Sequence, residues 1–258
     1  MYTVAFISQK GGVGKTTSVV NVGAAFCELD HSVLLIDLDP GGGLTNHLVN
    51  RRVSPVRSGE SVRSALTGEK SLSELIRVTE SGLHLVPSHP SLATVGVEVA
   101  AYAEQRLARA LDGLRSSGKE YRWVLIDCPP SLDLLPLNAL QAANGAIIPI
   151  SPEVLPAATL PPLLRVIHQV RTYGNRPDLR VLGVLPCMVR QRTRLAREVL
   201  RAVGLISTAL PAVRNSVKVA EAPGHFRPLL QYLPHHPAAD DYRTVAREIL
   251  SIVNGRGR

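Results

Sequence analysis

The apolar positions of this chain form short continuous runs that alternate with longer amphipathic stretches. Each short run holds four or five residues with few polar side chains, which is typical of strands buried on both faces of a parallel sheet. The runs predict strands at Val4–Ser8, Val33–Asp37, Leu83–Val86, Trp123–Asp127, Ala146–Ile150 and Val181–Leu185. Stretches with helical spacing predict helices over about 16–29, 97–114, 195–203 and 240–253, whereas residues 40–60, rich in Gly, Arg and Ser, predict a loop.

This alternation indicates an α/β fold in which helices cover both faces of a mainly parallel, twisted sheet. The 258 residues fit one such domain, and no repeat, low-complexity tract or linker divides them, so we expect a single domain over residues 1–258. No apolar run reaches the roughly 18–20 residues of a membrane-spanning helix. The N-terminus has no positively charged region of the kind that begins a signal peptide.

A glycine-rich loop, Q-K-G-G-V-G-K-T-T at residues 9–17, lies between the first predicted strand and the first predicted helix. Such a loop directs backbone N–H groups and the positive end of a helix dipole at phosphate oxygens. Lys15 is placed to reach the β- and γ-phosphates, and the Thr16 hydroxyl to bind Mg²⁺. The sequence therefore predicts a P-loop NTPase fold with ATP and Mg²⁺ as cofactors. The predicted ATP-binding residues of the loop are Lys10, Gly11, Gly12, Val13, Gly14, Lys15, Thr16 and Thr17.

The lysines of the loop carry further information. The chain has five lysines against 24 arginines, and two of the five are Lys10 and Lys15. The general P-loop pattern has a glycine at the position of Gln9 and does not require a lysine at the next position. The segment K-G-G-V-G-K-T-T is instead a deviant Walker A motif, and on it the chain resembles the ParA-type DNA-partitioning ATPases of the ParA/MinD superfamily.

This resemblance implies a slow, Mg²⁺-dependent ATPase that a partner stimulates. In the family, the extra lysine reaches across a nucleotide-sandwich dimer to the phosphates held by the other subunit. Carried over to this chain, that residue is Lys10, and Lys10 and Lys15 are both candidate catalytic residues. A cation supplied by a second subunit would make hydrolysis depend on dimerisation, as an arginine finger does.

Two carboxylate motifs fit the same site. D-L-D-P at 37–40 and V-L-I-D-C-P-P-S-L at 124–132 end predicted strands, and ligands bind at the carboxyl ends of parallel strands. The resemblance assigns Asp39, with Asp37 nearby, to orient the attacking water and contact the metal, and Asp127 to hold the Mg²⁺ shell. Alternatively, the carboxylates only cap strands. The family usually has D-P-Q-G-N where this chain has D-P-G-G-G, which predicts slower or uncoupled hydrolysis.

Positive charge gathers in the C-terminal third of the chain. Residues 1–160 carry a net charge of −2, and residues 161–258 a net charge of +10, which favours a polyanionic partner. The resemblance continues through 187–195 and 214–223, where the family binds double-stranded DNA without sequence preference. It implies DNA contacts at Arg190, Arg192, Arg194 and Lys218. The alternative is an arginine-rich solvated helix face. Near this region, Met188 and Pro211 are candidates for the base pocket.

The resemblance implies a cytoplasmic, nucleoid-associated homodimer that partitions chromosomes or plasmids with a ParB-like protein. A MinD-like membrane-associated ATPase is an alternative, but the last fifteen residues contain no aromatic side chain to anchor a helix at a membrane. The nitrogenase iron-protein class would need cysteines that bridge a cluster, and the chain has only Cys27, Cys128 and Cys187, far apart. A family member acting in metabolism or on another cargo remains compatible with the loop.

Overall fold

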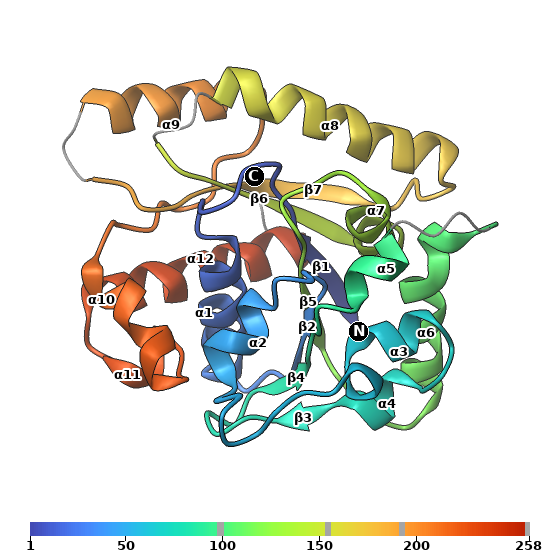
Figure 1. The fold of residues 1–258 in the computed structure, drawn as a ribbon. Helices are drawn as coiled ribbons and strands as arrows, with labels where there is room; N and C mark the ends of the chain where they lie inside the picture. The colour runs from blue at the N-terminus through green and yellow to red at the C-terminus, as the bar shows by residue number, and fades with distance from the viewer. Residues whose placement is uncertain (97–100, 153–155, 191–193, 256–258) are drawn as a thin grey trace.

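A twisted sheet of seven strands crosses the computed structural model, which describes residues 1–96, 101–152, 156–190 and 194–255 (Figure 1). The strand order is β3-β4-β2-β5-β1-β6-β7, and all neighbours are parallel except β3 and β4. The bounds are β1 (Tyr2–Phe6), β2 (Val33–Asp37), β3 (Arg77–Val78), β4 (His84–Val86), β5 (Trp123–Asp127), β6 (Gly145–Ile150) and β7 (Arg180–Pro186). The predicted α/β class is confirmed, and each predicted strand is present within two residues of its predicted bounds.

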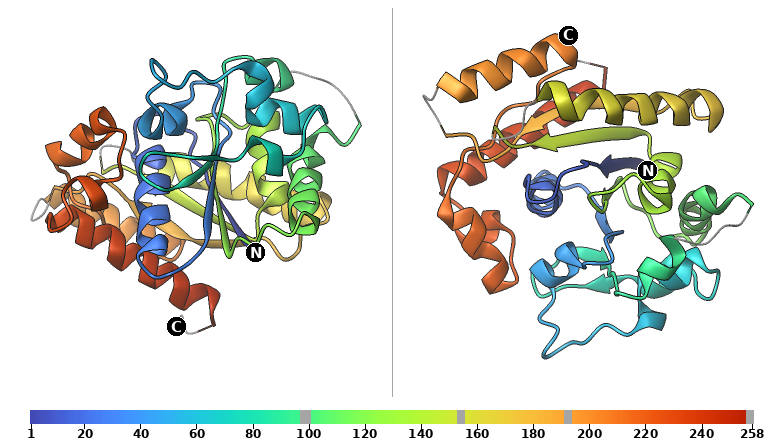
Figure 2. Two further views of the ribbon diagram at one scale, coloured as in Figure 1. Left: turned by 90° about the horizontal axis from the view of Figure 1, so that it is seen from below. Right: turned by 45° about the horizontal axis from the view of Figure 1, so that its top comes forward.

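Helices connect the strands and cover both faces of the sheet (Figure 2). Their bounds are α1 (Lys15–Cys27), α2 (Gly43–Leu48), α3 (Val62–Leu66), α4 (Leu72–Leu75), α5 (Leu92–Gly96), α6 (Arg106–Ser116), α7 (Leu134–Ala142), α8 (Pro156–Tyr173), α9 (Arg194–Ile206), α10 (Val217–Glu221), α11 (Leu229–Tyr232) and α12 (Pro237–Val253). Short 3-10 turns occupy Ser58–Glu60, Ala103–Gln105 and Ala222–His225. Within the described residues, no helix is both long enough and apolar enough to cross a membrane.

The sheet separates two apolar cores because successive side chains of a strand point to opposite faces. Along β1, Val4 and Phe6 pack with α1, α11 and α12, whereas Ala5 packs on the other face with α3, α6, α7 and α8. The interior strands β2, β5 and β6 are buried along their whole length. This double burial explains why these strands are continuous apolar runs in the sequence.

Some helix predictions were wrong. The loop predicted at 40–60 contains α2, and of the helix predicted over 97–114 the described residues from 101 on form an α-helix from Arg106. Tyr102 has a φ of 60°, a left-handed backbone conformation that an α-helix does not contain. Residues 97–100 lie outside the described residues. Helices α7 and α8 were not predicted. The first is apolar on most of its faces, and the second contains Pro161 and Pro162, which ordinarily indicate a break.

Helix α2 is joined to the C-terminal part of the chain through His47. This side chain is 3% exposed, and its Nε2 lies 3.1 Å from the carbonyl oxygen of Arg227. Burial lowers the pKa of His47 to about 4. Between that value and about 6.5 the unfolded chain binds a proton that the folded chain does not, so stability rises with pH across this range.

We expect the free energy of unfolding to fall by about 2 kcal/mol through His47 alone between pH 7.5 and pH 5. His47→Gln removes the titrating ring and keeps an amide that can donate to Arg227. The variant should therefore lack this part of the pH dependence in urea unfolding at the two pH values. An unchanged difference between pH 7.5 and pH 5 would show that His47 is not its source.

Candidate nucleotide and magnesium site

The strand order brings the three predicted phosphate-site motifs together. Because β5 lies between β2 and β1, and these three strands are parallel, their carboxyl ends meet at one edge of the sheet. The loop after β1 is the glycine loop, β5 ends at Asp127, and β2 ends at Asp37. Asp37 and Asp127 are register partners, so their carboxylates emerge side by side.

The glycine loop begins α1 with a backbone that only glycine adopts readily. Gly12 and Gly14 have φ values of 73° and 88°. A Cβ on Gly14 would lie 3.0 Å from the Cβ of Cys187, so a larger residue would push the loop against the segment after β7. Ser18 fixes the turn, since its backbone N–H and its hydroxyl both donate to the Gly14 carbonyl, at 2.9 and 2.7 Å.

Lys15 and Thr16 both meet Asp127, at the base of the loop. Thr16 Oγ1 donates to Asp127 Oδ2 at 2.6 Å, and Lys15 Nζ lies 3.4 Å from Asp127 Oδ1. Asp127 is fully buried, and Lys15 is 8% exposed. Burial disfavours the charged form of Lys15, but the carboxylates of Asp127 and Asp39 outweigh it and raise its pKa. Lys15 therefore keeps its positive charge where phosphates are expected.

The same cluster suits a magnesium ion. Asp127 Oδ1 is buried and accepts no hydrogen bond among the described residues, so the ion pair with Lys15 is its one polar contact there and capacity for a further ligand is left over. Carboxylate and hydroxyl oxygens are the ligands that Mg²⁺ prefers, and the ion usually keeps several waters. Thr16 and Asp127 thus fit the predicted metal contacts, with Asp39 on the same edge of the sheet.

The last residue of β2 and the loop after it hold two carboxylates in different surroundings. Asp37 is fully buried; burial and the adjacent Asp127 raise the pKa of Asp37 to about 7, although it accepts hydrogen bonds from the Thr45 N–H at 2.7 Å and hydroxyl at 2.6 Å. Asp39 is half-buried, and its Oδ1 accepts from the Gly41 N–H at 2.8 Å. Of the two, only Asp39 is accessible to a water molecule.

A cavity of about 150 Å³ adjoins the glycine loop. Gly14 and Thr17 line it from the loop and α1, Cys187 and Met188 from the segment after β7, and Val213–Ser216 from the segment before α10. Met188 has a φ of 55° and is 37% exposed. Of the two residues predicted for the base pocket, Met188 lines this cavity and Pro211 does not.

Lys10 differs from Lys15 in its surroundings. It lies on the exposed outer part of the glycine loop. Within the described part of the chain its side chain has no hydrogen-bond or ion-pair partner, and only its backbone N–H contacts Ser8 Oγ, at 3.4 Å. The two lysines of the loop therefore divide into one buried on the site and one exposed to solvent.

The two predicted DNA-binding segments run side by side. The N–H of Val189 donates to the Val213 carbonyl, and the N–H of Asn215 donates to the Val189 carbonyl, both at 3.0 Å. Arg190 is exposed at the end of the first segment, and Lys218 is exposed on α10, 2.7 Å from Glu221. Arg192 lies outside the described residues. Arg194 begins α9, and the structure does not describe its side chain.

Sequence reasoning missed residues that hold the site and its neighbouring segments in place. Arg214 donates to both carboxylate oxygens of Asp241 on α12, at 2.7 and 2.8 Å. Asn21 on α1 accepts from the Leu229 N–H at 2.8 Å and donates to the Thr17 carbonyl. Thr45, eight residues after Asp37 in the sequence, donates its hydroxyl to the Asp37 carboxylate. The only available signal was their position within or beside the motif segments.

The comparisons with known proteins agree with this geometry. The family model of the AAA domain matches residues 1–181. The chromosome-partitioning ATPase Soj of Thermus thermophilus is 39% identical over 253 residues, covering 97% of this chain and 96% of that protein. The sporulation initiation inhibitor protein Soj of Bacillus subtilis is 33% identical, with 95% and 97% covered. The chain belongs to the ParA-type family of P-loop ATPases.

A solved structure extends the similarity of this ParA-type chain to three dimensions. It is described as cobyrinic acid a,c-diamide synthase from Mycobacterium smegmatis with bound ADP and magnesium. It is 34% identical to this chain and superposes with a TM-score of 0.83. The alignment covers 98% of this chain and 96% of the chain in that structure. The predicted family resemblance and the predicted P-loop NTPase fold are both confirmed.

Proposed function

We propose that this ParA-type chain is an ATP-dependent partitioning ATPase that switches between monomer and DNA-bound homodimer. The cluster of Lys15, Thr16 and Asp127 supports nucleotide binding, and the exposed Lys10 on the same loop is the single observation that most favours a site completed by a second subunit. In this proposal one domain over residues 1–258 carries the whole cycle, in the cytoplasm and on the nucleoid.

The residues of the site divide the reaction among them. Backbone N–H groups of the loop from Lys10 to Thr17 hold the phosphates, and Lys15 neutralises the β- and γ-phosphates from within. When bound, Mg²⁺ supplies charge neutralisation at the transferred phosphoryl group. Thr16 and Asp127 would hold it. Asp39 orients the attacking water, and Lys10 of a second subunit stabilises the charge of the transition state.

The glycines at 41–43, in the loop after β2, affect the expected rate of ATP hydrolysis. Gly41 and Gly43 stand where the family usually has Gln and Asn, and neither glycine has a side chain to contact nucleotide or partner. A Cβ on Gly43 would lie 3.2 Å from Thr16 Oγ1, so the backbone itself approaches the metal ligand here. We infer a slow basal turnover that a ParB-like protein stimulates.

The proposed DNA surface consists of the paired segments around Arg190 and Lys218, with Arg192 and Arg194 beside them in the sequence. Contacts of lysine and arginine with phosphates bind DNA without reading its sequence. In a two-fold dimer each subunit would contribute the same surface, so that a long duplex meets both.

The decisive experiment measures duplex DNA binding with ATP, with ADP and without nucleotide, across a series of salt concentrations. We expect binding with ATP only, weakening steeply as salt rises. Equal DNA affinity with ATP, with ADP and without nucleotide would refute the proposed nucleotide-dependent switch. Binding to anionic vesicles in place of DNA would favour a MinD-like membrane function.

Lys218→Ala should weaken DNA binding equally for unrelated sequences and reduce the salt slope by about one for each phosphate that the protein no longer neutralises. The pairing of Lys218 with Glu221 lies on the surface, where such ion pairs add little stability, so the fold should be unaffected. Lys70→Ala removes an exposed lysine from another part of the chain and serves as the matched control. Equal slopes in the two variants would remove Lys218 from the DNA surface.

A metabolic function is the second candidate, because the similar Mycobacterium smegmatis structure is described as a cobyrinic acid a,c-diamide synthase. A synthase of this kind would consume ATP in the presence of its acid substrate and would not require DNA. ATP hydrolysis that requires a corrinoid acid and has the same rate with and without DNA would favour this candidate over partitioning.

A further inference from the structure

Four buried or half-buried residues close a ring of hydrogen bonds around the start of the loop after β2. Asp37 Oδ1 accepts from the Asp39 N–H at 3.2 Å, and Asp37 Oδ2 accepts from Thr45 Oγ1 at 2.6 Å. Thr45 Oγ1 in turn accepts from the Ser88 N–H at 2.9 Å, and Ser88 Oγ donates to the Asp39 carbonyl at 2.7 Å. Asp37, Thr45 and Ser88 are all 0% exposed.

The ring holds the backbone of Asp39 on both sides. Asp37 accepts from its N–H, and its carbonyl accepts both from Ser88 Oγ and, within the loop itself, from the Gly42 N–H at 2.8 Å. Among the described residues its side chain has a single hydrogen-bond donor, the Gly41 N–H. Three glycines follow at 41–43, one of them, Gly42, with a φ of 65°. Glycine is the most conformationally free residue, so this loop gives little stiffness of its own. The direction of the Asp39 carboxylate therefore depends on the ring.

The Thr45 hydroxyl makes two bonds of the ring, since it donates to Asp37 and accepts from the Ser88 N–H. Ser88 brings in a distant element, because it follows β4 and is 49 positions from Asp39. A hydroxyl is needed at both positions. Thr45→Val would leave the Ser88 N–H without its acceptor. Ser88→Ala would remove the bond that ties the Asp39 carbonyl to the segment after β4, leaving it only the Gly42 N–H of its own loop.

We propose that Thr45 and Ser88 are positioning residues that orient Asp39 for hydrolysis. This inference rests on the proposed function of Asp39 in directing the attacking water. Neither residue reaches the nucleotide in this role. They act through the Asp39 backbone, and misplacing a reacting group by about 1 Å can cost about 100-fold in rate.

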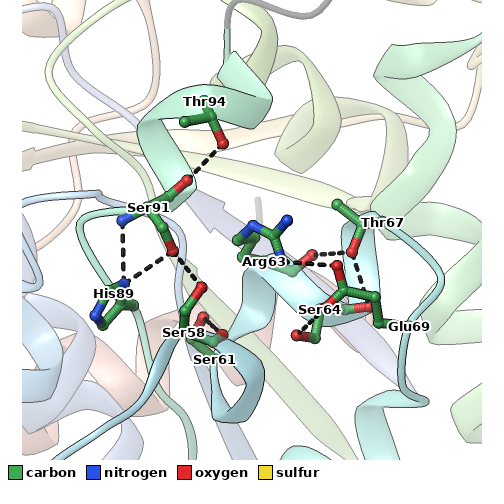
Figure 3. A network of polar contacts seen from close by, with 9 residues as sticks. All are labelled: Ser58, Ser61, Arg63, Ser64, Thr67, Glu69, His89, Ser91 and Thr94. Carbon is green, nitrogen blue, oxygen red and sulfur yellow. Dashed lines mark hydrogen bonds and ion pairs between the residues drawn. The ribbon is translucent and has the colours of Figure 1, made fainter.

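The test compares Ser88→Ala, Thr45→Val and the conservative Thr45→Ser with a matched control. Ser91→Ala removes a hydroxyl from the same loop after β4, where Ser91 bonds Ser58 and His89 in a separate polar network (Figure 3). We expect turnover to fall about 10- to 100-fold in Ser88→Ala and Thr45→Val. ATP affinity should stay within about threefold, because the glycine loop is untouched. Thr45→Ser and Ser91→Ala should resemble the unmodified protein.

A second measurement needs neither nucleotide nor turnover. Amide hydrogen exchange at Asp39 and Gly41 in the nucleotide-free protein should quicken about tenfold or more in Ser88→Ala and Thr45→Val, and be unchanged in Ser91→Ala. Unchanged exchange and turnover in Ser88→Ala would overturn the proposal, as would a Thr45→Ser protein as slow as Thr45→Val. If the unmodified protein hydrolyses no ATP with DNA and partner, the proposed function fails, and the exchange data still decide whether the ring holds Asp39.

Discussion

Replacing Lys10 with alanine should abolish partner-stimulated ATP hydrolysis, by about 10³-fold or more, while ATP affinity stays within about threefold. Cations that reach a phosphoryl group from a second subunit contribute about 10³–10⁵ in rate. The Lys10 side chain is exposed and has no partner among the described residues of its own chain, so its removal disturbs no contact that holds the loop. Stimulated turnover and fluorescent-ATP titration measure the two quantities.

Lys15→Ala is the contrasting variant. It removes the buried lysine that faces Asp127, and it should lose ATP binding itself. Lys10→Ala turnover equal to that of the unmodified protein would exclude the contribution from the other subunit. Loss of ATP binding in Lys10→Ala would place Lys10 in the site of its own chain.

Replacing Asp39 with asparagine should lower turnover by about 10²–10⁴, the usual contribution of a group that takes up or directs a proton in the transition state. Asparagine keeps the shape, and its oxygen can still accept from the Gly41 N–H, but the negative charge is gone. ATP binding should persist, because the phosphate contacts of the loop are unchanged. The variant should therefore remain on DNA with ATP after the unmodified protein has dissociated.

Mixing the two inactive variants tests both roles at once. In a mixed dimer, the subunit with Lys10→Ala keeps Asp39 and receives Lys10 from its Asp39→Asn partner, so one of two sites is complete. Random pairing of equal amounts makes half of the dimers mixed, and activity should return to about a quarter of the unmodified level. No recovery on mixing, with dimers formed, would show that the lysine and the aspartate do not act from different subunits.

Local sequence was sufficient for the elements whose pattern has one physical meaning. Strands β2 and β5 are buried on both faces, so each is a continuous apolar run with an aspartate at its end. The glycine loop between β1 and α1 was equally clear, because its spacing follows from the geometry of phosphate binding. Sequence reasoning failed at α8, whose internal prolines indicate a break, and at α2, which follows three glycines.

Contiguous motifs were enough to predict the α/β class, the family and the candidate residues Lys10, Lys15, Asp39 and Asp127. Which of these residues contact one another followed from the three-dimensional arrangement of the strands. Placing β5 between β1 and β2 brings Asp127 against Lys15 and beside Asp37, and the ring through Ser88 joins residues 49 positions apart. Such contacts depend on the order of the strands in the sheet, which the spacing of residues along the chain does not encode.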